Sequence, residues 1–290
     1  GILIPPSIVL VLYGMIARQP VSQLWLAGVG PGLLMTALFL VYILIRCKIN
    51  PKMGPILPKE ERNFSMKEKL RVLSAGIIPL LLIFSVIGSF FFGLTSLVES
   101  SAFGAFAAFV VALCRRRLTW KIFKKILRET LDNSAMFMWV MMAALAFAAV
   151  FDGLGAVRAL EGLFLNDWGL SPWQVLLLMQ LSFVILGIFL DDTAMLVIVA
   201  PLYIPLVMKL GFNPIWFGIL YTITCQIAYI TPPFGYNLFL MRAMSPKSIT
   251  IHDIYASIIP FVGLMLLALV LIMIFPQIAL WLPSLFNTKM

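Results

Sequence analysis

The sequence predicts an all-α polytopic membrane protein whose helices are broken at two places. Hydrophobic residues make up 62% of the 290 residues and charged residues 11%, whereas soluble domains are about 45–50% apolar and about 25% charged. Pro-Pro pairs interrupt two long apolar runs, at 5–6 and at 232–233. Proline lacks an N–H and disfavours helix at the residue before it, so a membrane helix must break there. Two such breaks, at corresponding places in two halves of a chain, are typical of the binding site of a secondary transporter.

The net charge of +9 comes largely from basic residues in two loops, and their positions indicate how the chain is oriented in the membrane. The loops, 46–71 and 115–130, are separated by a pair of expected spans and therefore lie on one side of the membrane. The positive-inside rule assigns that side to the cytoplasm. Because the charge lies in short loops, it does not indicate nucleic-acid binding.

The first half of the chain alternates apolar segments with polar connections. An apolar segment over 2–16 is broken at Pro5-Pro6. The expected spans 24–45 and 72–92 are each near the ~20 residues that a bilayer needs, and the shorter apolar run 102–114 leads out of the membrane again. In 115–130, apolar residues recur at helical spacing among cations. That pattern predicts an amphipathic helix on the inner membrane surface, with a solvated connector as the alternative.

The second half predicts a helical hairpin followed by a second broken helix. Residues 134–151 are expected to cross outward and 152–172 to form an external loop. Two apolar arms then flank Asp191-Asp192, which favours a re-entrant hairpin over about 173–210 rather than one span and a loop. The apolar run 215–230 leads back to the break at 231–233, and 258–283 is the expected final span.

Polar residues near these breaks are the candidates for chemistry. A carboxylate within an apolar segment is a functional-site hypothesis by default, which makes Asp191 and Asp192 candidates for substrate binding or ion coupling. The alternative is that one or both cap the helix that follows. Asn237 could reach a substrate or bond to a neighbouring helix. Thr231, with carbonyls freed around Gly187, Ala228 and Phe234, could form a Na⁺ cage, because hard cations take oxygen ligands; a purely structural kink is the alternative.

The pattern of reactive residues argues against an enzyme. His252 is the only histidine and stands beside Asp253 in an expected loop. No Gly-rich phosphate loop or metal-ligand cluster appears in the sequence. The cysteines, Cys47, Cys114 and Cys225, lack paired spacing, so we expect neither a disulfide nor a metal site other than one for Na⁺.

A set of short stretches is informative through its order and spacing along the chain. They are Gly1–Ser7, Tyr13-Gly14, Ala27–Gly32, Glu99–Gly104, Arg117–Trp120, Ser134–Met136, Gly187–Asp191, Gly211–Pro214, Phe217-Gly218 and Thr231–Phe239. Together these stretches resemble the large membrane subunit of tripartite ATP-independent periplasmic (TRAP) transporters. The resemblance covers essentially the whole chain, but only the later part of the family's length, so we expect the C-terminal portion of a longer protein.

The resemblance implies a Na⁺-coupled symporter of the ion-transporter type in the cytoplasmic membrane of a bacterium or archaeon. It implies two inverted repeats and a transport domain that moves as an elevator against a scaffold. The transport domain would comprise 1–17 and 132–257, the scaffold 22–114, and the helix 115–130 would link them. A small four-helix membrane subunit and a soluble periplasmic substrate-binding protein would be the partners, and the substrate a small organic acid.

Carried over by position, the resemblance also implies two ion sites. One would use Gly187, Ala228, Thr231 and Phe234, and the other would involve the break from Pro5 to Ser7. Ala228 departs from the glycine usual in the family, so a methyl group enters a tight turn. The alternatives from the residues alone are a channel-like or structural membrane subunit without ion coupling, and the membrane component of a primary transporter.

Overall fold

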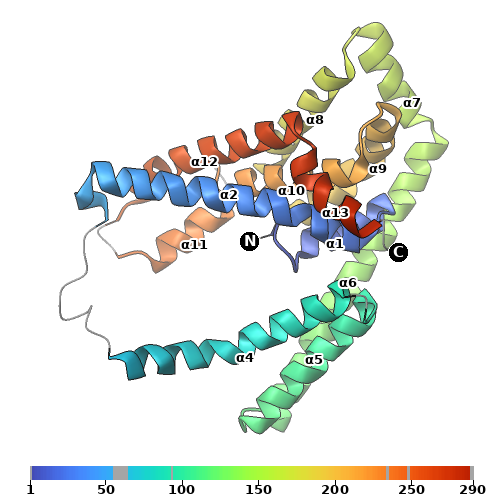
Figure 1. The fold of residues 1–290 in the computed structure, drawn as a ribbon. Coiled ribbons are helices and arrows are strands. Elements are labelled where there is room, and N and C mark those ends of the chain that lie inside the picture. The colour runs from blue at the N-terminus through green and yellow to red at the C-terminus, as the bar shows by residue number, and fades with distance from the viewer. Residues whose placement is uncertain (1, 55–64, 93, 233–234, 247–248, 288–290) are drawn as a thin grey trace. The chain divides into compact units, whose positions relative to one another are not determined.

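The computed structural model describes residues 2–54, 65–92, 94–232, 235–246 and 249–287. Every regular element in these ranges is helical, which confirms the predicted all-α class. The chain divides into two compact units, one of 1–41 with 137–290 and the other of 42–136. Figure 1 traces the helices of both units.

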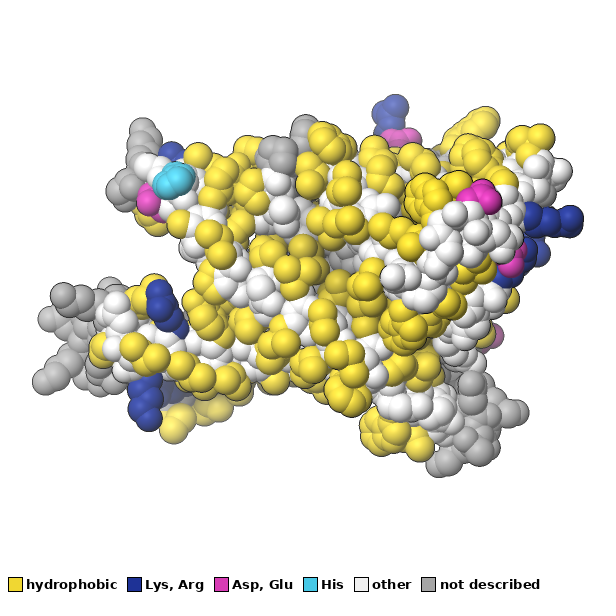
Figure 2. Space-filling view, turned by 90° about the horizontal axis from the view of Figure 1, so that it is seen from above, with side chains coloured by type: hydrophobic (Ala, Val, Ile, Leu, Met, Phe, Trp, Pro, Cys, Tyr) yellow, Lys and Arg dark blue, Asp and Glu magenta, His cyan; other side chains and the backbone are white. Residues whose placement is uncertain are grey.

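Length and composition identify candidate membrane spans among the described residues. Four helices qualify: Val21–Ile49 (α2), Trp120–Phe151 within α6, Asp192–Lys209 (α9) and Ile251–Ile274 (α12). A fifth is added if 66–74 and 76–91 count as one bent span. Hydrophobic side chains dominate the face of the molecule in Figure 2, and many large ones are exposed, as a surface in contact with lipid requires.

The unit of 42–136 contains two helices that pack against each other, α4 (Met66–Phe91) and α5 (Leu97–Cys114). Gly104 permits this packing, because a Cβ there would lie 2.6 Å from Val86 Cγ2. The buried Ser100 hydroxyl lies 2.5 Å from Thr95 Oγ1 and 3.3 Å from Ser89 Oγ. These hydroxyls satisfy one another where the chain turns from α4 into α5.

Two helices, α4 and α6, begin or continue where the sequence predicts a loop or a boundary between helices. The helix α4 begins at Met66, inside the expected loop 46–71, because Ser65 and Glu68 form a capping box. The helix α6 runs without interruption from Trp120 to Gly153, whereas the sequence suggests separate helices over 115–130 and 134–151. The connecting residues 131–133 contain neither Pro nor Gly, so nothing ends the helix between them.

The unit of 1–41 with 137–290 is built around α10 (Pro214–Ala228), whose residues are almost all buried. Helices α1 (Ile8–Ala17), α8 (Pro172–Gly187), α9 and α12 contact it. The hydroxyls of Thr222 and Thr224 donate to the carbonyls of Gly218 and Leu220, at 2.8 and 3.0 Å. Bonding to its own backbone lets α10 bury these hydroxyls in an apolar core.

The helices α8 and α9 form the helical hairpin expected at 173–210. Near its open end the rings of Trp173 and Phe212 are 5.2 Å apart, and midway the rings of Phe183 and Tyr203 are 5.4 Å apart. Residues 188–191 form the tip. The re-entrant course of this hairpin in a bilayer stays a prediction.

Shorter elements complete the unit. They are α7 (Ala156–Glu161), a π-helical turn η2 (Gly162–Asp167), α11 (Tyr236–Met244) and α13 (Gln277–Asn287), while the 3₁₀ turn η1 (Pro51–Met53) belongs to the other unit. The expected final span 258–283 is divided into α12 and α13, since Pro276 cannot continue the hydrogen bonding of α12. The inverted repeat stays a prediction.

Candidate functional site

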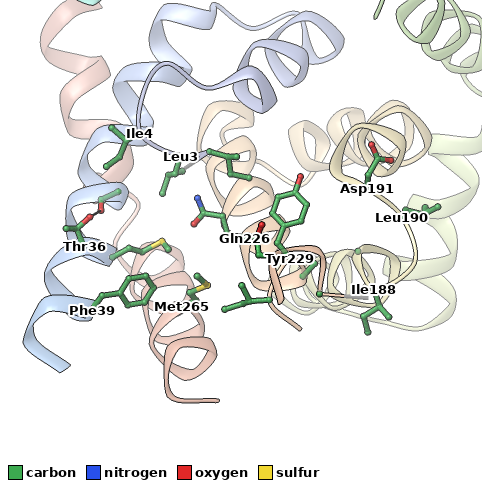
Figure 3. Close-up of a pocket in the computed structure, with 18 of the residues that line it drawn as sticks. Leu3, Ile4, Thr36, Phe39, Ile188, Leu190, Asp191, Gln226, Tyr229 and Met265 are labelled. Carbon is green, nitrogen blue, oxygen red and sulfur yellow. Dashed lines mark hydrogen bonds between the residues drawn. The ribbon is translucent and has the colours of Figure 1, made fainter. Parts of the chain in front are cut away.

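A cavity of about 880 Å³ lies within the unit of 1–41 and 137–290, where both helix breaks and the hairpin tip meet. Figure 3 shows Leu3 and Ile4 before α1, Thr36 and Phe39 on α2, and Asp191 at the hairpin tip. Its other walls come from the end of α10, the start of α11 and Met265 of α12. Segments that are far apart in the sequence thus share one cavity.

The first break is held by Ser7, which caps α1. Its hydroxyl accepts from the backbone N–H of Leu10 at 3.3 Å and donates to the carbonyl of Ile2. Trp25 Nε1 donates to the Ser7 carbonyl at 3.3 Å, and Ser7 is 1% exposed. The Pro5-Pro6 bond is cis, and Pro5 is half-buried. The cavity is lined by Leu3 and Ile4, and neither Pro5 nor Ser7 is among its lining residues.

The two aspartates of the hairpin tip have different surroundings. Asp191 is exposed, lines the cavity, and caps α9 by accepting from Ala194 N–H at 3.2 Å. Asp192 is half-buried in the first turn of α9 and is not among the lining residues. Its carbonyl accepts from the Tyr221 hydroxyl at 2.5 Å. Asp191 therefore has the capping position that the sequence offered as an alternative, with its side chain at the cavity.

The last residue of α8, Gly187, packs against the last residue of α10, Ala228, and this contact brings the hairpin tip beside the second break. A Cβ on Gly187 would lie 2.6 Å from the Ala228 Cβ, closer than two methyl groups can approach. Both residues line the cavity. The tip can therefore reach this position only because residue 187 has no side chain.

The second break is a turn closed by its own backbone. After α10 ends at Ala228, that residue's carbonyl accepts from Thr231 N–H at 3.1 Å, and the Tyr229 carbonyl accepts from Asn237 N–H at 3.2 Å. The half-buried Thr231 hydroxyl donates to the Ile227 carbonyl at 2.6 Å. Its oxygen keeps lone pairs for another partner, although Thr231 is not among the lining residues. Asn237 is exposed and lines the cavity, while Phe234 lies outside the described residues.

Comparison with known proteins identifies the family. The model of the tripartite ATP-independent periplasmic transporter, DctM component, matches residues 1–278. The chain belongs to the DctM family. This agrees with the resemblance noted in the sequence and covers the stretches that form the cavity.

Relatives of known name extend the comparison. The chain is 32% identical to the C4-dicarboxylate TRAP transporter large permease protein of Pseudomonas aeruginosa, over 98% of this chain and 65% of the relative. It is 30% identical to the sialic acid TRAP transporter large permease protein of Vibrio cholerae, over 99% and 65%. It is 28% identical to the ectoine TRAP transporter large permease protein of Halomonas elongata, over 98% of this chain and 64% of the relative.

The chain thus spans about 65% of the length of the relatives it matches. Their names describe transporter permeases and not enzymes, in agreement with the prediction of a non-enzymatic protein. The apolar helices and the DctM family together identify a multi-pass protein of the inner membrane.

Three polar lining residues of this DctM-family cavity were not singled out from the sequence. They are Thr36, Gln226 and Tyr229. Thr36 donates to the carbonyl of Gly32 at 2.8 Å, as do many threonines within membrane helices, so nothing in the sequence distinguishes it. Gln226 did carry a signal, since it is an isolated amide in an apolar run just before the break. None of the described lining residues is Lys or Arg.

Proposed function

We propose that this chain forms part of the large membrane subunit of a secondary transporter that takes up a small organic acid together with Na⁺. A periplasmic binding protein would deliver the solute, and a small membrane subunit would complete the assembly. The observation that carries the proposal is the cavity, in which two helix breaks and a hairpin tip meet. Discontinuous helices around one cavity are the usual construction of such sites in secondary transporters.

The Na⁺ part of the proposal rests on the oxygen atoms around the second break. Gly187 and Ala228 are in close contact, and Thr231 follows Ala228 within the same turn. The Ala228 carbonyl and the Thr231 hydroxyl each have a lone pair beyond the hydrogen bond that they make. Hard cations take such oxygen ligands, and a residue with a methyl group still offers its carbonyl.

The substrate part rests on the relatives and on helix ends. C4-dicarboxylates, sialic acid and ectoine, the compounds in the names of the three relatives reported above, all carry a carboxylate. The helix α11 begins beside the cavity after Gly235, whose position provides no side-chain cap, whereas the Asp191 carboxylate already caps the N-terminus of α9. Helix N-termini favour an anion, and Na⁺ would offset the charge of the solute in a cavity whose described lining holds no basic residue.

The alternating-access part rests on family membership. We propose an inverted repeat whose transport domain, including 1–17 and 132–257, moves as an elevator against a scaffold that includes 22–114. The hairpin α8–α9 supports this assignment, because it packs on α10 and carries one wall of the cavity.

Uptake into proteoliposomes tests the proposal. The full-length protein would be reconstituted with its small subunit and its binding protein, with a Na⁺ gradient or a K⁺ gradient imposed. Labelled succinate, sialic acid and ectoine would be the probes. We expect uptake of one probe to require both Na⁺ and the binding protein. Flux that is independent of the gradient would instead support a channel-like subunit, and flux that requires ATP would support a primary transporter.

The Thr231→Ala variant tests the ion site in the same assay. Loss of one oxygen ligand should lower the apparent Na⁺ affinity about tenfold, equivalent to about 1.4 kcal/mol. Thr222→Ala is the matched control, because its hydroxyl also donates to the carbonyl four residues earlier but lies in the core of α10. Equal Na⁺ responses of the two variants would move the ion site away from the second break.

A further inference from the structure

Seven cations gather where α5 ends and α6 begins. Arg115, Arg116 and Arg117 follow α5, and Lys121, Lys124, Lys125 and Arg128 lie in the first turns of α6. We call these seven residues the basic corner. All seven are exposed, and all belong to the unit of 42–136. The proposed function uses none of them.

The α6 part of the basic corner forms a single stripe. Positions 121, 124, 125 and 128 follow the spacing i, i+3, i+4, i+7, so their side chains share one face of the helix. Ile122, Phe123, Ile126 and Leu127 occupy the other side. The Phe123 ring meets the Phe109 ring of α5 at 5.9 Å, so the apolar side is turned toward α5 and the stripe away from it.

The positive charge of the stripe is almost uncompensated within the described chain. Within the stripe, one ion pair is present among the described residues, between Lys125 and Glu129 at 3.6 Å, and both side chains are largely exposed. An ion pair between two exposed side chains contributes little to the stability of the protein. Lys124 lies 5.4 Å from the centre of the Trp120 ring, and Trp120 is itself 68% exposed. An exposed tryptophan beside cations is typical of the membrane–water interface.

The position of the basic corner at the end of the apolar helix α5 places it near the level of lipid headgroups. Residues 134–151 of α6, the continuous helix that carries the stripe, are apolar and long enough to cross the hydrocarbon. Along α6 the stripe lies about 9–20 Å before residue 134, whereas one headgroup layer is roughly 5–8 Å thick. The helix α5 brings the corner closer to the membrane, because Arg115 directly follows its apolar end and the Phe123 ring contacts the Phe109 ring of α5. The positive-inside rule assigns this end to the cytoplasm, where the leaflet surface is negatively charged.

We propose that the basic corner binds the phosphate of anionic phospholipid headgroups in the inner leaflet. Arginine guanidinium groups can contact a phosphate in bidentate fashion, and lysines add point charges around it. The Trp120 ring would lie among the glycerol and carbonyl groups of the same lipids. Bound lipid would then fix the depth of the α5–α6 junction in the membrane. This inference does not depend on the substrate or on Na⁺.

Native mass spectrometry of the purified full-length protein in detergent tests the proposal. The probes are phosphatidylglycerol, phosphatidylcholine with the same acyl chains, and inorganic phosphate. The variant K121Q/K124Q/K125Q/R128Q removes the stripe. The control R46Q/K48Q/K67Q/K69Q removes four exposed cations from the other basic loop. Each cation near the surface is worth about fivefold in affinity for an anionic surface, so the stripe variant should bind phosphatidylglycerol at least tenfold more weakly.

Because the control cations also lie in a loop assigned to the cytoplasm, the control should bind phosphatidylglycerol somewhat more weakly than wild type, and the stripe variant more weakly than the control. Phosphatidylcholine should not discriminate among the three proteins. The proposal would be overturned if the stripe variant bound phosphatidylglycerol as tightly as wild type does. Displacement of the lipid by millimolar inorganic phosphate would also overturn it, in favour of a free-phosphate site.

A second measurement avoids the fourfold variant if that protein does not fold. In vesicles, the fluorescence difference between wild type and Trp120→Phe isolates the emission of Trp120. Brominated phosphatidylglycerol should quench that emission more strongly than brominated phosphatidylcholine at equal mole fraction, and 0.5 M salt should abolish the difference. Equal quenching by the two lipids would contradict a preference for anionic headgroups.

Discussion

The contact between Gly187 and Ala228 leaves no room for a second methyl group. The Cβ of Gly187→Ala would stand 2.6 Å from the Ala228 Cβ. Overpacking of this kind typically costs about 1–3 kcal/mol, so Gly187→Ala should lower the melting temperature in detergent and reduce uptake. The double variant Gly187→Ala/Ala228→Gly moves the methyl group to the other partner and should recover most of both losses.

A control separates this clash from a general effect of alanine. Gly263 lies in α12, and apart from its chain neighbours and the backbone of its own helix no atom lies within 4 Å of the position its Cβ would take. Gly263→Ala should leave the melting temperature unchanged or raise it slightly, because alanine favours helix. If the double variant were as unstable as Gly187→Ala alone, the tip would not rest on Ala228 as described.

Asp191 combines two roles that substitutions can separate. Its carboxylate caps α9 and also lines the cavity. Asparagine is as good a cap as aspartate, whereas alanine costs about 0.5–2 kcal/mol. Asp191→Asn should therefore keep the wild-type melting temperature but lose uptake, and Asp191→Ala should lose both. Wild-type uptake kinetics for Asp191→Asn would reduce Asp191 to a cap, and uptake by Asp192→Asn would show whether its half-buried neighbour matters independently.

For single residues, the sequence could identify candidates for the functional site but not the residues that they contact in the fold. The Pro-Pro pairs and the isolated carboxylates are local features, so they can be found by inspection. The contact of Gly187 with Ala228 joins two elements that are distant along the chain, and no local pattern encodes it. Thr36 reached the cavity only through the packing of α2, and its own surroundings in the sequence are ordinary.

The hairpin of α8 and α9 is held by polar as well as aromatic contacts. Ser182 Oγ and the Tyr203 hydroxyl lie 3.0 Å apart across the two arms. Ser182→Ala and Tyr203→Phe should each destabilise the protein, and the double variant should be little worse than either one. A coupling of about 0.5–1.5 kcal/mol is expected for a neutral hydrogen bond.

Thermal unfolding of the four proteins measures this coupling. Ser245→Ala supplies the comparison, because its hydroxyl donates to Met241 at the end of α11 and takes no part in the hairpin. Its effect should add to that of Tyr203→Phe. Additivity of Ser182→Ala with Tyr203→Phe as well would mean that the two arms are not joined at this point.

Helix boundaries were the least predictable features at the scale of elements. Hydropathy locates apolar segments but does not register helix ends, which depend on caps and prolines. Two of these signals are present as local patterns in the sequence. They are the capping box of Ser65 and Glu68, which begins α4, and Pro276, which follows the end of α12. The continuity of α6 was harder to foresee, because a change from basic to apolar composition resembles a boundary without containing one.

For the whole molecule, composition alone was enough to predict the class, because few sequences that are 62% hydrophobic could remain soluble. The cavity required the three-dimensional arrangement, since its walls come from α2, α10, α12 and the hairpin tip. Orientation lies between these two cases. It follows from charge asymmetry in the sequence, and the helices place the charges at helix ends without showing which side of the membrane they face.

Native cysteines provide a direct test of this orientation. Cys114 is exposed at the end of α5, beside the basic corner, whereas Cys225 is buried in α10. In a protein with Cys47→Ser and Cys225→Ser, a membrane-impermeant maleimide should label Cys114 in inside-out vesicles and not in intact cells. Adding Asn166→Cys to a variant without Cys114 should reverse the pattern, because Asn166 is exposed in the segment expected outside.

The labelling result bears on both proposals in different ways. Labelling of Cys114 from outside would place the basic corner at the outer leaflet and contradict its assignment to inner-leaflet lipids. The cavity would survive that result, because its geometry lies within one unit and does not depend on which side faces the cytoplasm. The ends of the helices assigned to the cytoplasm would then face the periplasm, and the solute would enter the cavity from the opposite end. Labelling of Cys114 and residue 166 from the same side would instead contradict a single crossing by α6, which connects them through its apolar segment.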